Sequence, residues 1–215
     1  MIPQPSTLFI ACGALAREVV ELIRLNGWTH VTVGCLPASL HNTPAEIPEA
    51  VRAKIRAARG RFDHIAVLYG DCGSGSLLDK VLDEEGVERI PGPHCYEFYA
   101  GKPDFEALMD EEPGSFFLTD YLVRHFERLI IKGLGLDRHP QLRDSYFANY
   151  RRLIYLAQTR SDKLEAQARA AAERLGLDYQ VRYTGYGELG RFMEQARAPS
   201  AGTLDHGDRD HRLLA

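Results

Sequence analysis

The sequence predicts an α/β protein with one mostly parallel, Rossmann-like sheet and helices on both faces. Short apolar, β-branched segments alternate along the chain with longer segments of helical spacing. Turns containing Gly, Pro or Asn separate them. This alternation is typical of parallel strands joined by crossover helices. No repeat of solenoid period interrupts it.

The predicted elements follow one another with short connections. Seven apolar runs are expected to be strands, at 7–11, 31–36, 65–69, 87–90, 115–119, 153–157 and 179–183. Helical periodicity or composition predicts helices at 14–26, 48–60, 77–82, 104–110, 120–132, 140–150, 161–175 and 188–196. Such spacing is that of βα units packed into a compact sheet.

The length and composition fit one globular unit. The chain has 215 residues, of which 45% are hydrophobic and 26% are charged, values ordinary for a folded domain. We expect a single α/β domain over residues 1–196. From Arg197 the sequence is polar and aperiodic, which predicts a disordered tail over 197–215.

The charge and hydropathy patterns exclude some classes of partner. The chain carries 26 basic and 30 acidic residues, a net charge of −4, so nucleic acid is not the expected partner. No apolar run approaches the ~20 residues that span a bilayer. The start of the chain lacks secretory-signal features. We therefore expect a cytoplasmic protein, whose four cysteines are buried thiols, metal ligands or redox groups.

The most informative stretch runs from Ile65 to Ser76. Its apolar first half predicts a buried strand, and Gly70, Cys72 and Gly73 lie in a Gly-rich turn that leads to a helix. Ligands of open α/β sheets bind at such turns. The helix N-terminus is expected to favour the thiolate form of Cys72.

Two further cysteines follow strands in the same way. Cys12 ends the first predicted strand, and Cys95 follows the strand at 87–90. The turns after parallel strands emerge at one edge of the sheet, so Cys12, Cys72 and Cys95 are candidates for one site. Cys35 lies within a strand and is expected to point into the core.

Three readings of the cysteine pattern stay open. The thiols could hold an iron–sulfur cluster with one open iron, or a catalytic zinc with His41 or His94 as a further ligand. They could instead form a thiol-only catalytic site. The third reading is plain buried cysteines.

Residues around the thiols complete the predicted site. Gly13, Tyr69, Gly70 and Gly73 are expected to contact the cofactor, because glycine lets the backbone approach a ligand closely. His94 and Glu97 flank Cys95 and are the candidate catalytic residues for proton transfer. Glu18 is a further acid–base candidate.

Several short motifs together resemble a family. They are Ala11-Cys12, Leu40-His41-Asn42, Tyr69-Gly70-Asp71-Cys72-Gly73, Ile90-Pro91-Gly92-Pro93-His94-Cys95 and Phe117-Leu118-Thr119. The combination resembles a bacterial and archaeal family known only as a domain of unknown function, over roughly residues 7–196. Many members carry an Asp between the His and the third Cys, whereas His94 and Cys95 adjoin here.

The resemblance implies a role in one-carbon metabolism. Members are often encoded near corrinoid-dependent methyltransferases and their corrinoid proteins. The chain has no Asp-x-His-x-x-Gly motif, so a partner would carry the corrinoid. The resemblance therefore implies a metal- or cluster-dependent protein of methyl transfer that acts on a small molecule. The alternative is a non-catalytic metal-binding or accessory partner of a corrinoid methyltransferase system.

Overall fold

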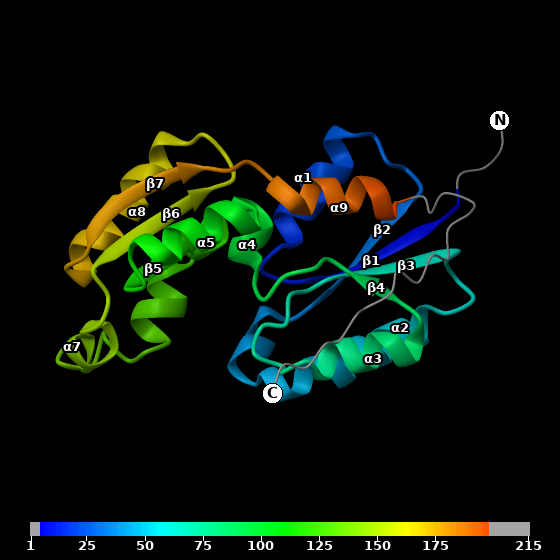
Figure 1. Ribbon diagram of the computed structural model, residues 1–215, viewed down its shortest axis with the longest axis horizontal. Coiled ribbons are helices and arrows are strands. Elements are labelled where there is room, and N and C mark those ends of the chain that lie inside the picture. The colour runs from blue at the N-terminus through cyan, green and yellow to red at the C-terminus, as the bar shows by residue number, and fades with distance from the viewer. Residues whose placement is uncertain (1–4, 198–215) are drawn as a thin grey trace, which may run out of the picture.

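The computed structural model describes residues 5–197. The α/β class with parallel sheets is confirmed, but the strands divide between two sheets instead of forming one (Figure 1). The first sheet has the order β2-β1-β3-β4 and the second the order β5-β6-β7, and all these strand pairs are parallel. The predicted tail, apart from Arg197, lies outside the described residues.

The first half of the chain builds the first sheet. Its elements are β1 (Thr7–Cys12), α1 (Ala16–Leu25), β2 (Val31–Leu36), the 3₁₀ turns η1 (Ala38–Asn42) and η2 (Pro44–Glu46), α2 (Ile47–Ala58), β3 (His64–Leu68), α3 (Leu77–Glu85) and β4 (Glu88–Arg89). Two short helices, α4 (Cys95–Ala100) and α5 (Lys102–Glu111), lead to the second sheet.

The second half builds the other sheet and then returns. Its elements are β5 (Ser115–Thr119), α6 (Asp120–Arg124), the π-helix η3 (Glu127–Lys132), α7 (Leu142–Phe147), β6 (Arg152–Ala157), α8 (Asp162–Leu175), β7 (Asp178–Tyr183) and α9 (Gly187–Ala196). The helix expected over 120–132 is thus interrupted near His125, where α6 ends.

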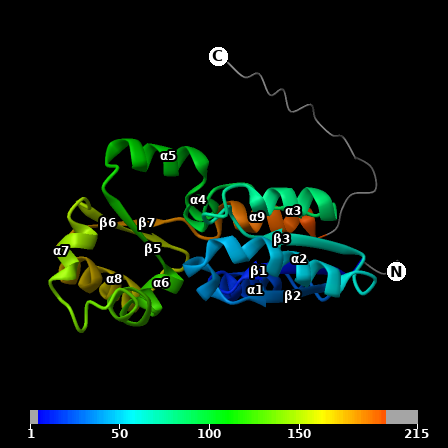
Figure 2. The same ribbon diagram turned by 90° about the horizontal axis from the view of Figure 1, so that it is seen from below.

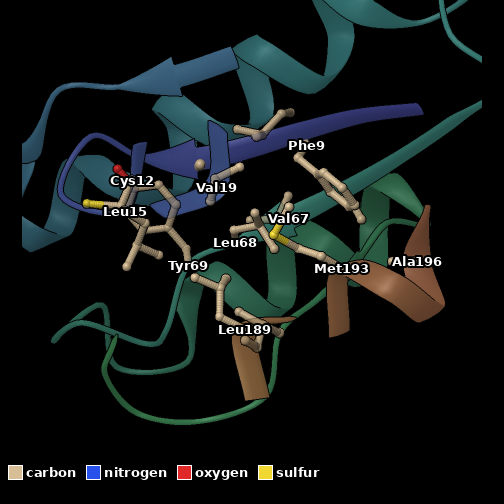
Figure 3. Close-up of a cluster of buried hydrophobic side chains, with 14 of the residues drawn as sticks. Phe9, Cys12, Leu15, Val19, Val67, Leu68, Tyr69, Leu189, Met193 and Ala196 are labelled. Atoms are coloured by element: carbon tan, nitrogen blue, oxygen red, sulfur yellow. The ribbon is translucent and has the colours of Figure 1, made fainter. Parts of the chain in front are cut away.

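Helices cover both faces of the first sheet. Helices α2 and α3 lie on one face, and α1 and α9 lie on the other (Figure 1). Met193 of α9 is fully buried in the same core as Phe9 of β1 and Val67 of β3 (Figure 3). The last helix therefore packs on the sheet formed by the first strands.

Two smaller hydrophobic cores lie on the two faces of the second sheet, and alternate side chains of β6 belong to each. Leu153 and Tyr155 belong to the core beneath α6 and α8, whereas Ile154 and Leu156 pack with Phe105 of α5. Figure 2 shows α5 on one side of this sheet and α6 and α8 on the other. Successive side chains of a strand point to opposite faces, so the apolar residues of β6 after Arg152 serve both cores.

Cys35 is placed differently from the prediction. It lies in β2, which is the edge strand of the first sheet, and its side chain is exposed. An edge strand is covered by the sheet on one side only, so an apolar sequence does not guarantee burial.

Within residues 5–197, no helix combines the length and apolar character needed to cross a membrane.

Candidate cysteine site at the edge of the first sheet

The turn that carries Cys72 is organised by Asp71. The carboxylate of Asp71 accepts hydrogen bonds from Ser76 N at 2.9 Å, Ser74 Oγ at 3.0 Å and Gly73 N at 3.2 Å. Cys72 itself has a left-handed backbone, with φ of 49°. These bonds lower the pKa of Asp71, with the Ser76 amide as the largest cause. The turn is therefore held by its own carboxylate.

The loop that carries Cys95 is joined to this turn through the backbone. Asp71 N donates to Gly92 O at 3.2 Å, and Cys72 N donates to Pro93 O at 2.8 Å. Gly70 makes the contact possible, because a Cβ there would lie 2.8 Å from Pro93 O. Cys72 and Cys95 therefore come from two loops that run against each other.

The loop that carries Cys12 is joined in the same way to the segment that carries His41. Gly13 N donates to Leu36 O at 2.8 Å, and a Cβ on Gly13 would lie 2.9 Å from that oxygen. Cys12 Sγ lies 3.8 Å from His41 Nδ1 and accepts from Ala14 N at 3.3 Å. The structure therefore brings Cys12 and His41 together. Backbone of the protein occupies the space beside Gly13 and Gly70.

Tyr69 lies between these groups. Its ring stacks on His41 with a centroid separation of 6.2 Å, and its side chain is fully buried. Figure 3 shows the phenol oxygen directed towards Cys12. Among the described residues the Cys12 thiol is the polar group that this hydroxyl faces, at the margin of hydrogen-bond geometry. The hydroxyl and the thiol therefore interact directly.

The Nδ1 atom of His41 faces both Cys12 Sγ and a backbone carbonyl. Its Nδ1 lies 3.1 Å from Ala38 O, which suits a tautomer whose Nδ1–H donates to that carbonyl. The lone pair of Nε2 is then free. Metal-binding histidines commonly donate their other ring N–H to a backbone carbonyl or carboxylate.

Burial raises the pKa of all three thiols, and like charge raises the pKa of Cys72 and Cys95 further. Burial raises the pKa of Cys12, and burial followed by the charge of Cys12 raises the pKa of Cys72 to about 11. Burial, then Cys72 and Cys12, raise the pKa of Cys95. The thiols thus share one electrostatic environment, in which each thiolate disfavours the next.

The expected preference of Cys72 for the thiolate form is wrong. Its pKa is raised, because desolvation and the Cys12 charge are the larger effects. Helix α3 begins only at Leu77, and the helix dipole acts mainly within the first turn.

The donor set suits a soft metal or an iron–sulfur cluster. Thiolates and imidazole are the ligands of zinc and of such clusters, and a bound cation would counteract the repulsion between the thiolates. No group of three or more His, Cys, Asp or Glu side chains in residues 5–197 has the arrangement of a metal site. Metal ligation by Cys12, Cys72, Cys95 and His41 therefore stays a prediction.

The two candidate catalytic residues lie in other surroundings. The ring of His94 packs edge-on against Phe105 at 5.7 Å, and burial lowers its pKa. Glu97 lines a cavity of about 340 Å³ with residues of α5 and α9, such as Lys102 and Phe192. Gly73 lies against Pro44. Their catalytic and cofactor-binding roles stay predictions.

Sequence reasoning gave no role to Asp71 or Arg89. Arg89 donates to both Ile90 O at 2.8 Å and Gly92 O at 3.2 Å, and it pairs with Asp79 at 2.7 Å. It thereby fixes the path of the loop before Cys95. An Asp followed by Gly and Ser residues is a signal for a side-chain-capped turn and could have identified Asp71.

These observations define a two-sheet α/β protein with three cysteines at or after strand ends on the carboxyl edge of one sheet. The family model described as "Protein of unknown function (DUF1638)" matches residues 35–193. The chain belongs to this family. The match includes His41, Cys72 and Cys95, and Cys12 precedes it.

Other comparisons add little. No curated protein matches the chain. Among solved structures, the chain is similar to ornithine carbamoyltransferase from Pyrococcus furiosus, with 13% sequence identity and a TM-score of 0.26. The alignment covers 84% of this chain and 55% of that one, so this chain spans about half of that protein. A likeness this low carries no argument about function.

Proposed function

We propose that Cys12, Cys72 and Cys95, with His41, hold an iron–sulfur cluster or a zinc ion. The single observation that carries the proposal is the joining of separate loops at one edge of the first sheet, with Cys12 Sγ 3.8 Å from His41 Nδ1. Backbone hydrogen bonds fix these loops in two pairs, Cys12 with the segment before His41 and Cys72 with the loop of Cys95. Preorganised ligand loops reduce the conformational cost of binding a metal.

The bound group would supply Lewis-acid or electron-transfer chemistry, and the chain would supply its surroundings. Tyr69 would direct its hydroxyl into the site, and the Ala38 carbonyl would orient His41. Burial of Cys12 and Tyr69 would exclude water. Such a setting suits chemistry on a small-molecule substrate.

The biological setting that we propose is one-carbon metabolism. The resemblance of the motifs to a family encoded near corrinoid methyltransferases supports it, with the corrinoid carried by a partner protein. The second candidate is a non-catalytic accessory protein of the same system. Metal-dependent turnover of a methyl donor would favour the enzyme, and stable complex formation with a corrinoid protein without turnover would favour the accessory role.

Metal content measured on protein purified without oxygen tests the site. We expect iron with a brown absorbance if a cluster is bound, or zinc in a colourless protein. Cys72→Ser should lose the metal, because a serine hydroxyl is a far poorer ligand. Cys35→Ser is the matched control and should keep it, since Cys35 is exposed on the edge strand.

The histidine distinguishes the two metals. His41→Ala should lower zinc content if zinc is the metal, and it should spare a cluster held by three thiolates. Full retention of metal in Cys72→Ser would refute the site. A chain that remains metal-free after anaerobic reconstitution would leave the thiol-only and buried-cysteine readings.

A further inference from the structure

A second polar cavity lies where the two sheets meet, apart from the thiols. Its volume is about 310 Å³, and α1, α6, the turn after β6 and the approach to α9 surround it. Figure 2 shows α6 on the side of the second sheet that faces the first. The lining residues are Arg17, Glu18, Glu21, Asp120, Arg124, Thr159, Ser161 and Tyr186.

One wall of this cavity is a fixed carboxylate. Asp120 is 1% exposed and accepts hydrogen bonds from Tyr155 Oη at 2.6 Å, Thr159 Oγ1 at 2.6 Å and Gln158 N at 3.0 Å. Arg124 lies 3.6 Å from the same carboxylate. The hydrogen-bonding capacity of Asp120 is therefore used within the protein, and its negative charge is partly balanced.

Glu18, which also lines the cavity, differs from Asp120 in its hydrogen bonding. Its side chain is buried, with 4% exposed, and Oε2 has no hydrogen-bond partner among residues 5–197. Burial of a carboxyl group without a partner is costly, and the nearby charge of Asp120 adds to the cost. Oε2 of Glu18 therefore lacks a hydrogen-bond donor among the described residues.

The cavity also contains an unused cation. Arg17 is exposed and forms no ion pair with the described residues, whereas Glu21 is paired with Arg24 at 2.6 Å. Among the charged groups that line the cavity, the buried carboxyl group of Glu18 and the guanidinium of Arg17 are the two that form no ion pair within the described residues. Their chemistry complements a molecule that has both a cationic donor and a carboxylate.

We propose that this cavity binds a small zwitterion of the amino-acid class. The ammonium group of the ligand donates to Glu18, and its carboxylate pairs with Arg17. None of the lining residues belongs to the proposed metal site, so the inference does not depend on whether a metal is bound. No covalent step is involved.

Isothermal titration of the full chain with each of the twenty standard amino acids tests the proposal. We expect at least one to bind at concentrations up to about 10 mM. The matching amine without the carboxylate and the matching acid without the ammonium group should bind about tenfold or more weakly, because each lacks one charged contact. Absence of binding across the panel would overturn the proposal.

Three variants identify the contacts. Glu18→Gln keeps the shape of the side chain and removes its charge, and it should weaken binding about tenfold or more. Arg17→Gln should do the same from an exposed position, so its folding is not in question. Glu127→Gln lies outside the cavity and replaces an acid already paired with Arg174, and it should bind as the unaltered chain does. Equal losses in all three, or none, would contradict the assigned contacts.

Discussion

Cys72 shows how the surroundings of a single residue decide its ionisation. A turn ahead of a helix suggests an activated thiolate, but Cys72 is separated from Leu77, the first residue of α3, and two other thiols lie in its electrostatic environment. Desolvation and like charge then dominate the dipole. The three thiols are therefore suited to ionise together with a cation and not as free nucleophiles.

Glu18 gives the clearest prediction at the residue scale. Burial raises its pKa above 4.5, so the stability it contributes is fully present below the pKa of the unfolded chain and is lost as the pH rises through the raised value. Glu18→Gln should therefore increase the free energy of unfolding at pH 8, by about 1–3 kcal/mol. The gain should shrink towards pH 4.5.

Urea denaturation over this pH range measures the effect. Glu21→Gln is the control, because Arg24 lowers the pKa of Glu21. In this variant the free energy of unfolding should show no increase that grows with pH. A gain for Glu18→Gln that is independent of pH would mean that its carboxyl group is not buried unpaired.

At the scale of elements, the candidate site consists of loops more than of strands. Two pairs of loops are fastened by backbone hydrogen bonds, the turn of Cys72 to the loop of Cys95 and the turn of Cys12 to the segment before His41. Each junction contains a glycine, Gly70 or Gly13, with no room for a side chain. The relative placement of the thiols therefore depends on these glycines.

Gly70→Ala should separate the loops of Cys72 and Cys95. A Cβ at 2.8 Å from Pro93 O must displace backbone, which is expected to cost about 1–3 kcal/mol of stability. The melting temperature and the metal content should both fall. Gly190→Ala is the control, because its Cβ would meet nothing closer than 3.7 Å. An unchanged melting temperature in Gly70→Ala would show that the loops are not tightly joined.

On the scale of the whole molecule, α9 connects the end of the described chain to its beginning. Met193 is fully buried against the first sheet, and Thr7 Oγ1 donates to Arg197 O at 2.8 Å. The second sheet is thus an insertion between β4 and α9 of the first.

Met193→Ala should weaken the first sheet selectively. Loss of a buried Met side chain is expected to cost about 2–5 kcal/mol. Hydrogen exchange should show a larger loss of amide protection in β1 and β3, which belong to the first sheet, than in β6, which belongs to the second. Leu25→Ala is the control, because Leu25 is 59% exposed and its loss should change little. Equal loss of protection in both sheets would mean that they unfold as one unit.

The sequence predicted local structure better than the assembly of its parts. The strand at 115–119 is β5, Cys12 ends β1, and the turn after β3 carries Cys72. Strand alternation does not reveal which strands pair, so the division into two sheets was missed. The exposure of Cys35 depends on β2 being an edge, and the burial of Glu18 depends on contacts distant in sequence. Neither property is encoded in local periodicity.

The insertion of the second sheet has a consequence for synthesis on the ribosome. Strands β1 to β4 and helices α1 to α3 emerge first, but α9, which shares one face of their sheet with α1, is translated after the whole second sheet. The nascent first sheet therefore keeps part of this apolar face exposed, around Phe9 and Val67, while the second sheet can already close. Chaperones that bind exposed apolar surface would meet this half of the molecule, and its folding would be completed only after release of α9 from the exit tunnel.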